Sequence, residues 1–218
     1  MRVGSGLAGP GQVRRSWLNR PVHTLARLLE APAVDALLTA ADGVMNGNTL
    51  LIGAYLDEPI TSGNRKSALE TYLGGPLFPA AMRAADAARE WGNLRSGPMV
   101  RPQIDLQLSE VSEAGFRDLL HWMLREAFSP YQHHLDAPHA EAVIDTFMDW
   151  LHHDATPSVG DEAWAVWSAR PDFLYTSGYY SNEPPLTDAA YFDGGSNDTA
   201  TFLHRGDVLM LLLTNGSP

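Results

Sequence analysis

The feature that most constrains the fold is an uninterrupted apolar run, Val208–Leu213. A strand points its side chains alternately to two faces, so a run that is apolar at every position needs cover on both faces. The run follows a second strand-like segment, Thr199–His204, and Arg205-Gly206 between them predicts a hairpin with a two-residue loop in which Gly206 supplies a positive φ. We therefore expect an antiparallel sheet near this end of the chain, with a covered central strand.

The first two thirds of the sequence have helical periodicity, in which apolar residues recur at steps of three and four. Ser and Asp at N-cap positions and Pro at the ends delimit these stretches. The expected helices are Pro21–Ala41 with a break at Pro32, Pro79–Trp91, a helix that Ser112 opens and Ser129 ends, and a helix that Asp136 opens and Pro157 ends.

Other segments predict strands or stay ambiguous. Gln103–Ser109 alternates apolar and polar residues, which is typical of a half-buried strand. Ile60–Lys66 contains Ser, Gly and Asn in succession and is expected to be a loop. The remaining segments are Thr49–Leu56, which fits a strand or a buried helix, Glu162–Ala169, which fits either type, and Phe173–Thr176 and Ala189–Phe192, which fit strands.

Together these patterns predict an α+β protein, in which a helix-rich N-terminal two thirds packs on a small, mainly antiparallel C-terminal sheet. Residues 1–16 are glycine-rich and are expected to form a flexible segment. Residues 17–218 are expected to form a single domain, helical over 17–156 and strand-rich over 157–218.

Composition excludes several classes of function. The chain has no cysteine, which rules out disulfides, cysteine-ligated metals and thiol catalysis. Its 15 Lys and Arg residues against 26 Asp and Glu give a net charge of −11, which argues against general nucleic-acid binding. No apolar run approaches the roughly 18 residues that a membrane helix needs. No apolar signal region follows the Arg14-Arg15 pair, so we expect a cytoplasmic protein.

The candidate catalytic residues are His204, Asp193 and Asp198. Asp193 and Asp198 flank a loop rich in glycine and polar residues, which is a common setting for functional groups. Strand alternation places His204 on the same face as Ala200 and Phe202. If that face is the core, His204 lies at its rim, where it would act as a general base oriented by a carboxylate. The alternative is a solvated histidine at the end of a hairpin.

The candidate substrate-binding residues are Asn197, Tyr179, Tyr191 and Trp167, in a region rich in aromatic residues. Small-molecule pockets are mostly apolar with a few polar groups, which this composition would supply. The alternative is that the same aromatic residues fill the core between sheet and helices, their commoner use.

Cofactors receive little support from the sequence. His133 and His134 are weak candidates for metal ligands, because they lie in a histidine-rich region without the spacing of a metal site. Gly4, Gly6 and Gly9 match a dinucleotide-binding pattern, but no room remains before them for the strand that this motif requires. We therefore predict neither a metal nor an organic cofactor.

An acidic stripe lies along the helix that Asp136 opens. Glu141, Asp145 and Asp149 recur every four residues, on the side away from the apolar stripe. Such a face is ordinarily only solvated, but together with the negative net charge it would also suit a basic protein partner.

Two functions follow from these features. The first is a small soluble enzyme that uses His and Asp acid–base chemistry on a small molecule in an aromatic-lined pocket, as a hydrolase, lyase, isomerase or cyclase. The second is an acidic protein-binding module, such as an intracellular immunity-type neutraliser of a basic toxin. The sequence does not decide whether the chain is an enzyme, and no resemblance to a known family guides the choice.

Overall fold

The computed structural model describes residues 28–45, 49–87, 104–129, 131–155, 163–173 and 198–214. Its elements are α2 (Pro32–Met45), β1 (Thr49–Tyr55), α3 (Arg65–Gly74), α4 (Leu77–Ala87), β2 (Ser109–Val111), α5 (Glu113–Arg125), α6 (Ala137–His153), β3 (Ala165–Ala169), the 3-10 turn η2 (Pro171–Phe173), β4 (Thr199–Arg205) and β5 (Val208–Thr214). This arrangement confirms the α+β class expected from the sequence. The expectations for residues 1–16 and for Ala189–Phe192 fall outside the described residues.

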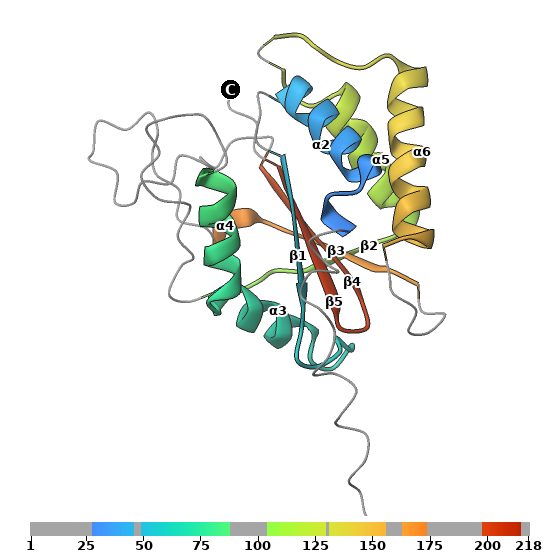
Figure 1. The fold of residues 1–218 in the computed structure, drawn as a ribbon. Helices are drawn as coiled ribbons and strands as arrows, with labels where there is room; N and C mark the ends of the chain where they lie inside the picture. Colours follow the sequence, from blue (N-terminus) through green and yellow to red (C-terminus); the bar gives the residue numbers. More distant parts are fainter. Residues whose placement is uncertain are drawn as a thin grey trace, which may run out of the picture.

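The strands form one antiparallel sheet in the order β1-β5-β4-β3-β2 (Figure 1). β1 pairs with β5 along its whole length, from Thr49 opposite Thr214 to Tyr55 opposite Val208. β3 joins β4 to the three-residue edge strand β2. Two of the five strands, β1 and β2, thus come from the part of the chain that the sequence marks as mainly helical.

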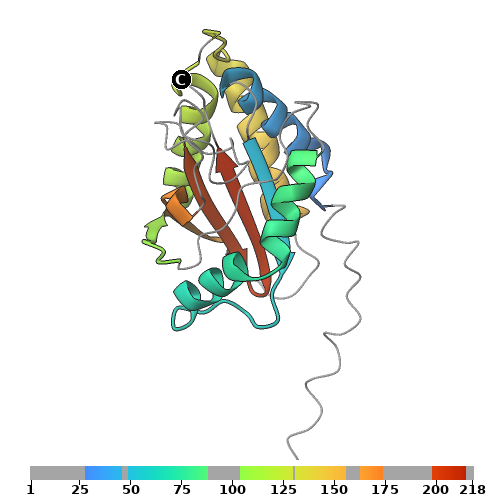
Figure 2. The same cartoon turned by 90° about the vertical axis from the view of Figure 1, so that its left-hand side faces the viewer.

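Helices cover both faces of this sheet, as Figures 1 and 2 show. On one face α2, α5 and α6 enclose a core that includes Phe116, Phe147 and the sheet residues Leu203 and Met210. On the other face α3 and α4 enclose a second core around Phe202, with Phe78, Phe173 and the leucines of β5 that point this way. The sheet is therefore the middle layer of three.

The expected covering of Val208–Leu213 is confirmed. All seven residues of β5 are buried, and they alternate between the two cores, with Leu211 facing α3 and α4 and Leu212 facing the other helices. The hairpin loop, however, lies one residue later than predicted. Arg205 pairs with Val208, so the loop is Gly206-Asp207, and Gly206 has a φ of +59°. A positive φ at the first loop position is typical of a type II′ turn, which favours glycine there.

Several helix boundaries follow from local chemistry. The hydroxyl of Ser112 accepts from the backbone N–H of Gly115, and the carboxylate of Asp136 accepts from that of His139, so both predicted N-caps are confirmed. The predicted break at Pro32 is also confirmed, because α2 begins there. Proline suits the first position of a helix, where its missing N–H would have no partner.

The loop predicted over Ile60–Lys66 from Ser62, Gly63 and Asn64 is wrong at its end, where α3 begins. The segment does become helical from Arg65. Its buried side chains, Leu69, Tyr72 and Leu73, have the three- and four-residue spacing of an amphipathic helix.

The strand predicted over Gln103–Ser109 forms only at its end, where β2 starts at Ser109. Burial still alternates over 104–108, and Leu106 is buried between exposed neighbours. Over residues 104–108, side chains of α3 make the backbone hydrogen bonds that a neighbouring strand would make. Leu106 donates its N–H to Glu70 (3.0 Å), and its carbonyl accepts from Lys66 (2.7 Å). Lys66 also pairs with Glu70 at 2.9 Å and with Asp105.

We expect Lys66→Met to loosen this segment without unfolding the protein. The substitution removes the ammonium that holds the Leu106 carbonyl and orients Glu70, so the Leu106 amide hydrogen should exchange with solvent several-fold faster. Hydrogen exchange followed by NMR measures this, with Leu120 in α5 as the internal reference. Gln107→Met, at an exposed neighbouring position, is the matched control. Unchanged exchange at Leu106 in the Lys66→Met variant would contradict the interpretation.

The ambiguous segment around the two tryptophans is a strand, β3. Trp164 and Trp167 therefore contribute to different cores, one on each side of the sheet. Trp164 donates its indole N–H to the carbonyl of Leu151, at the end of α6 (2.8 Å). Among the described residues, no helix has the length and apolar character to span a bilayer.

Candidate functional site

His204, the predicted general base, lies on the sheet face that α3 and α4 cover. Only 6% of the residue is exposed, and its Nε2 atom has no hydrogen-bond partner among the described residues. Burial, and to a smaller extent the charge of Arg65, lower the pKa of His204 to about 4. The imidazole is therefore neutral at pH 7 and is a weak base in a site with little access to solvent.

The structure does not bring Asp198 to His204. Asp198 precedes β4, whereas His204 lies near the far end of the same strand. Six residues of extended chain span about 20 Å, too far for a carboxylate to orient an imidazole. Asp193, Asn197, Tyr179 and Tyr191 lie outside the described residues, so their positions relative to His204 stay predictions.

Trp167, the remaining predicted binding residue, lies on the same sheet face as His204. Trp167 pairs with Phe202 of β4, and His204 is the next residue of β4 that points to the same face. The guanidinium carbon of Arg65 lies 3.7 Å from the centre of a Trp167 ring. This cation–π contact occupies a face of the ring that a substrate would need for stacking.

The histidine pair lies away from these residues. His133 and His134 are exposed in the connection between α5 and α6, which belong to the opposite layer. A ring nitrogen of His134 shares a hydrogen bond with the Ala127 carbonyl (2.8 Å), and His133 lies beside Tyr131. Within the described ranges, no group of three or more potential metal ligands forms.

The acidic stripe on α6 is partly neutralised within the protein. Arg117 of α5 bonds to Glu141 (2.7 Å) and to Asp145, and His121 lies 3.2 Å from the Glu141 carboxylate. A basic partner would have to compete with these contacts, so the stripe offers less free negative charge than its sequence suggests.

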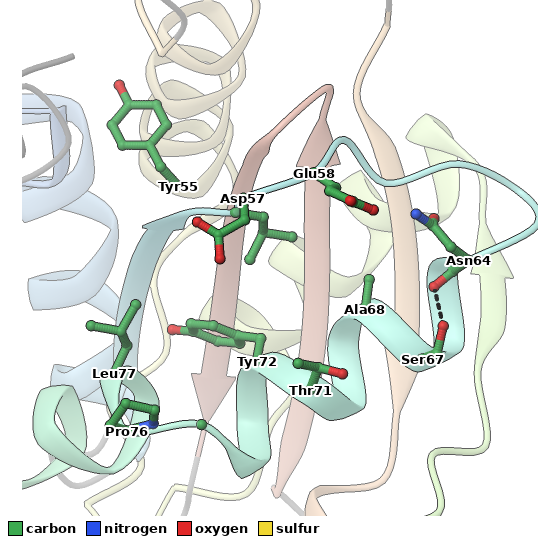
Figure 3. A pocket seen from close by; sticks show the side chains of 12 residues that line it. Tyr55, Asp57, Glu58, Asn64, Ser67, Ala68, Thr71, Tyr72, Pro76 and Leu77 are labelled. Carbon is green, nitrogen blue, oxygen red and sulfur yellow. Dashed lines mark hydrogen bonds between the residues drawn. The ribbon is translucent and has the colours of Figure 1, made fainter. Parts of the chain in front are cut away.

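A different site, which the sequence did not indicate, is a cleft of about 540 Å³ beside α3 (Figure 3). It lies between the end of β1 with the loop after it, one side of α3, and the connection to α4. The lining residues are Tyr55, Leu56, Asp57, Glu58, Asn64, Ser67, Ala68, Thr71, Tyr72, Gly75, Pro76 and Leu77. This volume falls within the usual range for small-molecule sites.

The loop that forms one wall of this cleft is fixed at both ends. The N–H of Leu56 donates to the Asp207 carbonyl (2.8 Å), and that of Ile60 donates to the Gly206 carbonyl (3.0 Å), so the β4–β5 turn supports the loop. At the other end, the side-chain oxygen of Asn64 accepts from the N–H of Thr61 (2.7 Å). The cleft is therefore preformed, which lowers the entropic cost of binding.

The polar groups of the cleft include three without partners. Asp57 and Glu58 are exposed and make no ion pair with any described residue. Tyr72 is only 6% exposed, yet its hydroxyl has no hydrogen-bond partner among the described residues. Figure 3 shows this hydroxyl pointing from α3 toward the β1 side of the cleft, whereas the Tyr55 hydroxyl points away from it. Burial raises the pKa of Tyr72, so its hydroxyl keeps the proton.

A second hollow of about 570 Å³ lies where the start of α2 meets the end of α6. Its polar lining residues, Thr146, Asp149, His153 and Asp154, are all exposed. The cleft beside α3 differs from this hollow in having a wall, the loop after β1, that backbone hydrogen bonds hold to the β4–β5 turn.

The sequence did carry signals for this cleft. The spacing of Leu69, Tyr72 and Leu73 predicts a helix, and Lys66 and Glu70 add a favourable pair four residues apart. The approach of Asp57 and Glu58 to Tyr72 had no such signal, because it depends on the path of the loop over the β4–β5 turn.

Comparisons with protein-family models, with curated proteins and with solved structures found no match to this chain.

Proposed function

We propose that the protein binds a small organic molecule in the cleft beside α3. The observation that carries this proposal is the hydroxyl of Tyr72, which lies at a preformed cleft and has no described partner. The Tyr72 ring is buried while its hydroxyl points toward the β1 side of the cleft, so a ligand can bond to this group without displacing the side chain. Such a hydrogen bond contributes about 0.5–1.5 kcal/mol.

We further propose that the protein performs acid–base catalysis on the small molecule that it binds in the cleft. Within the described residues, the titratable groups of the lining are Asp57, Glu58, Tyr72 and Tyr55, and the Tyr55 hydroxyl points away from the cleft. His204 is less suited to the role, because its imidazole is buried and weakly basic. The alternative proposal is an acidic module that binds a basic protein through the net negative charge and the stripe of Glu141, Asp145 and Asp149. We place it second because Arg117 already pairs with Glu141 and Asp145.

The proposal is tested by filling the cleft. Ala68 lines it from α3, so Ala68→Trp should place an indole where a ligand would lie and abolish binding. A library of small metabolites is screened against the wild-type protein by ligand-observed NMR, and each binder is measured again with the variant. The matched control is Ala142→Trp, an exposed position on α6 at the other side of the sheet.

We expect binders of the wild type to be retained by Ala142→Trp and lost with Ala68→Trp, while both variants keep the wild-type circular dichroism spectrum. Binders that Ala68→Trp leaves unaffected would show that the ligand site lies elsewhere. Capture of a basic protein in the absence of any small-molecule binder would favour the alternative proposal.

A further inference from the structure

We infer that the cleft selects an organic cation, a molecule in which an ammonium or guanidinium group is attached to a short apolar body. This inference rests on the proposed function, since it names the ligand class of the same cleft. Three observations carry it: the sign of the charges in the lining, the Tyr72 hydroxyl, which points into the site without a described partner, and the apolar surface among the lining residues.

The charges at the cleft are negative only. Its lining includes Asp57 and Glu58 but no Lys, Arg or His residue. Two basic residues lie next to the lining in sequence. Lys66 is held by Glu70, Asp105 and the Leu106 carbonyl, and the guanidinium of Arg65 lies over the Trp167 ring, 3.7 Å from its centre. Two adjacent carboxylates without ion pairs raise the local negative potential, which attracts a cation and repels an anion.

The Tyr72 hydroxyl adds a specific polar contact to this charge. Its oxygen accepts a hydrogen bond from an ammonium or guanidinium N–H, while the raised pKa of the residue keeps the phenol neutral. The ring is held in place by Phe78, at 5.8 Å between ring centres. A preoriented acceptor in a lining that also carries two carboxylates suits the several N–H donors of an amine or guanidine.

Beside the polar side chains of Asn64, Ser67 and Thr71, the lining also has apolar surface, which favours an organic ligand over a small hydrated ion. Leu56, Ala68, Pro76 and Leu77 contribute hydrocarbon surface to the cleft. A divalent metal ion needs six or more oxygen ligands and gains nothing from such surface. An organic cation buries its apolar body there, at a gain of roughly 25 cal/mol for each Å² removed from water.

The test uses three benzene-ring probes of similar shape and different charge, together with the aliphatic dication agmatine, measured by ligand-observed NMR and isothermal calorimetry. Benzylamine and agmatine are the cationic probes, benzyl alcohol is the neutral probe and benzoate is the anionic one. Calcium chloride alone tests for a metal site. The variants are Asp57→Asn with Glu58→Gln, and Tyr72→Phe, which retains the ring. Asp118→Asn is the matched control, since Asp118 is exposed on α5 and makes no ion pair with any described residue.

We expect the cationic probes to bind at least about tenfold more tightly than benzyl alcohol, and benzoate not to bind. The double carboxamide variant should lose about tenfold in affinity for benzylamine, Tyr72→Phe about fivefold, and Asp118→Asn nothing. Binding should also weaken as salt is raised, because the carboxylates are exposed.

Equal affinity for benzylamine and benzyl alcohol, or no binding of either cation, would overturn the inference. If neutral binders are found and Ala68→Trp removes them, the cleft is the ligand site and only the charge class is wrong. If binders are found that Ala68→Trp does not affect, the proposed function itself fails. Calcium binding that the double variant abolishes, without any amine binding, would replace the organic cation by a metal ion.

Discussion

Acidification from pH 7.5 to 4.5 is expected to destabilise the folded protein by about 2–3 kcal/mol through His204 alone. The pKa of this residue is about 4 in the folded protein against 6.5 for an ordinary histidine. The unfolded chain therefore binds the proton first as the pH falls. The contribution to stability is complete above pH 6.5 and is lost as the pH falls toward 4.

The physical cause is the position of the imidazole. His204 is 6% exposed, on the sheet face that α3 and α4 cover. Its protonation would place a second positive charge beside Arg65, and its Nε2 atom has no hydrogen-bond partner among the described residues. The carboxylates of Asp105 and Asp136 also have lowered pKa values, but their contributions are lost only as the pH falls below about 3.8. Among the described groups whose pKa is shifted, His204 is therefore the one whose protonation lowers stability between pH 6.5 and 4.5.

Urea unfolding, followed by tryptophan fluorescence at several pH values, measures this effect. The variant His204→Leu cannot be protonated, so its stability should fall by about 2–3 kcal/mol less than that of the wild type over this interval. His153→Gln, at an exposed position in the last turn of α6, is the control and should behave as the wild type. Parallel pH profiles for the wild type and His204→Leu would refute the buried neutral imidazole.

A second large effect is expected at Phe78, where Phe78→Ala should lower the free energy of unfolding by about 3–5 kcal/mol. Phe78 is fully buried and lies between Tyr72 (5.8 Å between ring centres) and Phe173 (6.2 Å). Phe173 in turn lies 6.2 Å from Phe202 of β4. Truncation at Phe78 opens a cavity in the middle of this aromatic row, and the neighbouring rings cannot fill it without leaving their own contacts.

Urea unfolding at pH 7.5 also tests this prediction. Phe128→Ala is the matched control, because Phe128 is 50% exposed and should cost less than about 1 kcal/mol. Phe78→Leu keeps most of the volume and should fall between the two. A loss at Phe78 no larger than that at Phe128 would mean that the row does not support the layer of α3 and α4.

The sequence predicted best where one local pattern decides the structure. Strands β4 and β5 follow from their apolar alternation, and α5 and α6 follow from periodicity together with the caps at Ser112 and Asp136. The predicted hairpin loop, Arg205-Gly206, lies one residue too early, because a glycine with positive φ fits either position of a two-residue loop. The positive φ of Gly206 serves the first position of the turn.

Prediction was weaker where tertiary contacts decide. Residues 104–108 alternate as a strand does, but their backbone bonds to Lys66 and Glu70 of α3, which no local pattern reveals. The chemistry of the candidate site depends on tertiary contacts even more strongly. His204 and Trp167 do lie on one sheet face, but burial and the contact of Arg65 change the chemistry that their residue types suggest.

The sheet order also determines when the cleft can exist during synthesis. The β4–β5 turn supports the loop beside α3, and Thr49 of β1 pairs with Thr214, across most of the chain. A nascent chain that has emerged only as far as α6 therefore lacks both the partner of β1 and the anchor of the cleft wall. Because such long-range pairing is slow, β1 stays exposed to aggregation until β5 leaves the ribosome. Ligand binding would then mark chains that have completed folding.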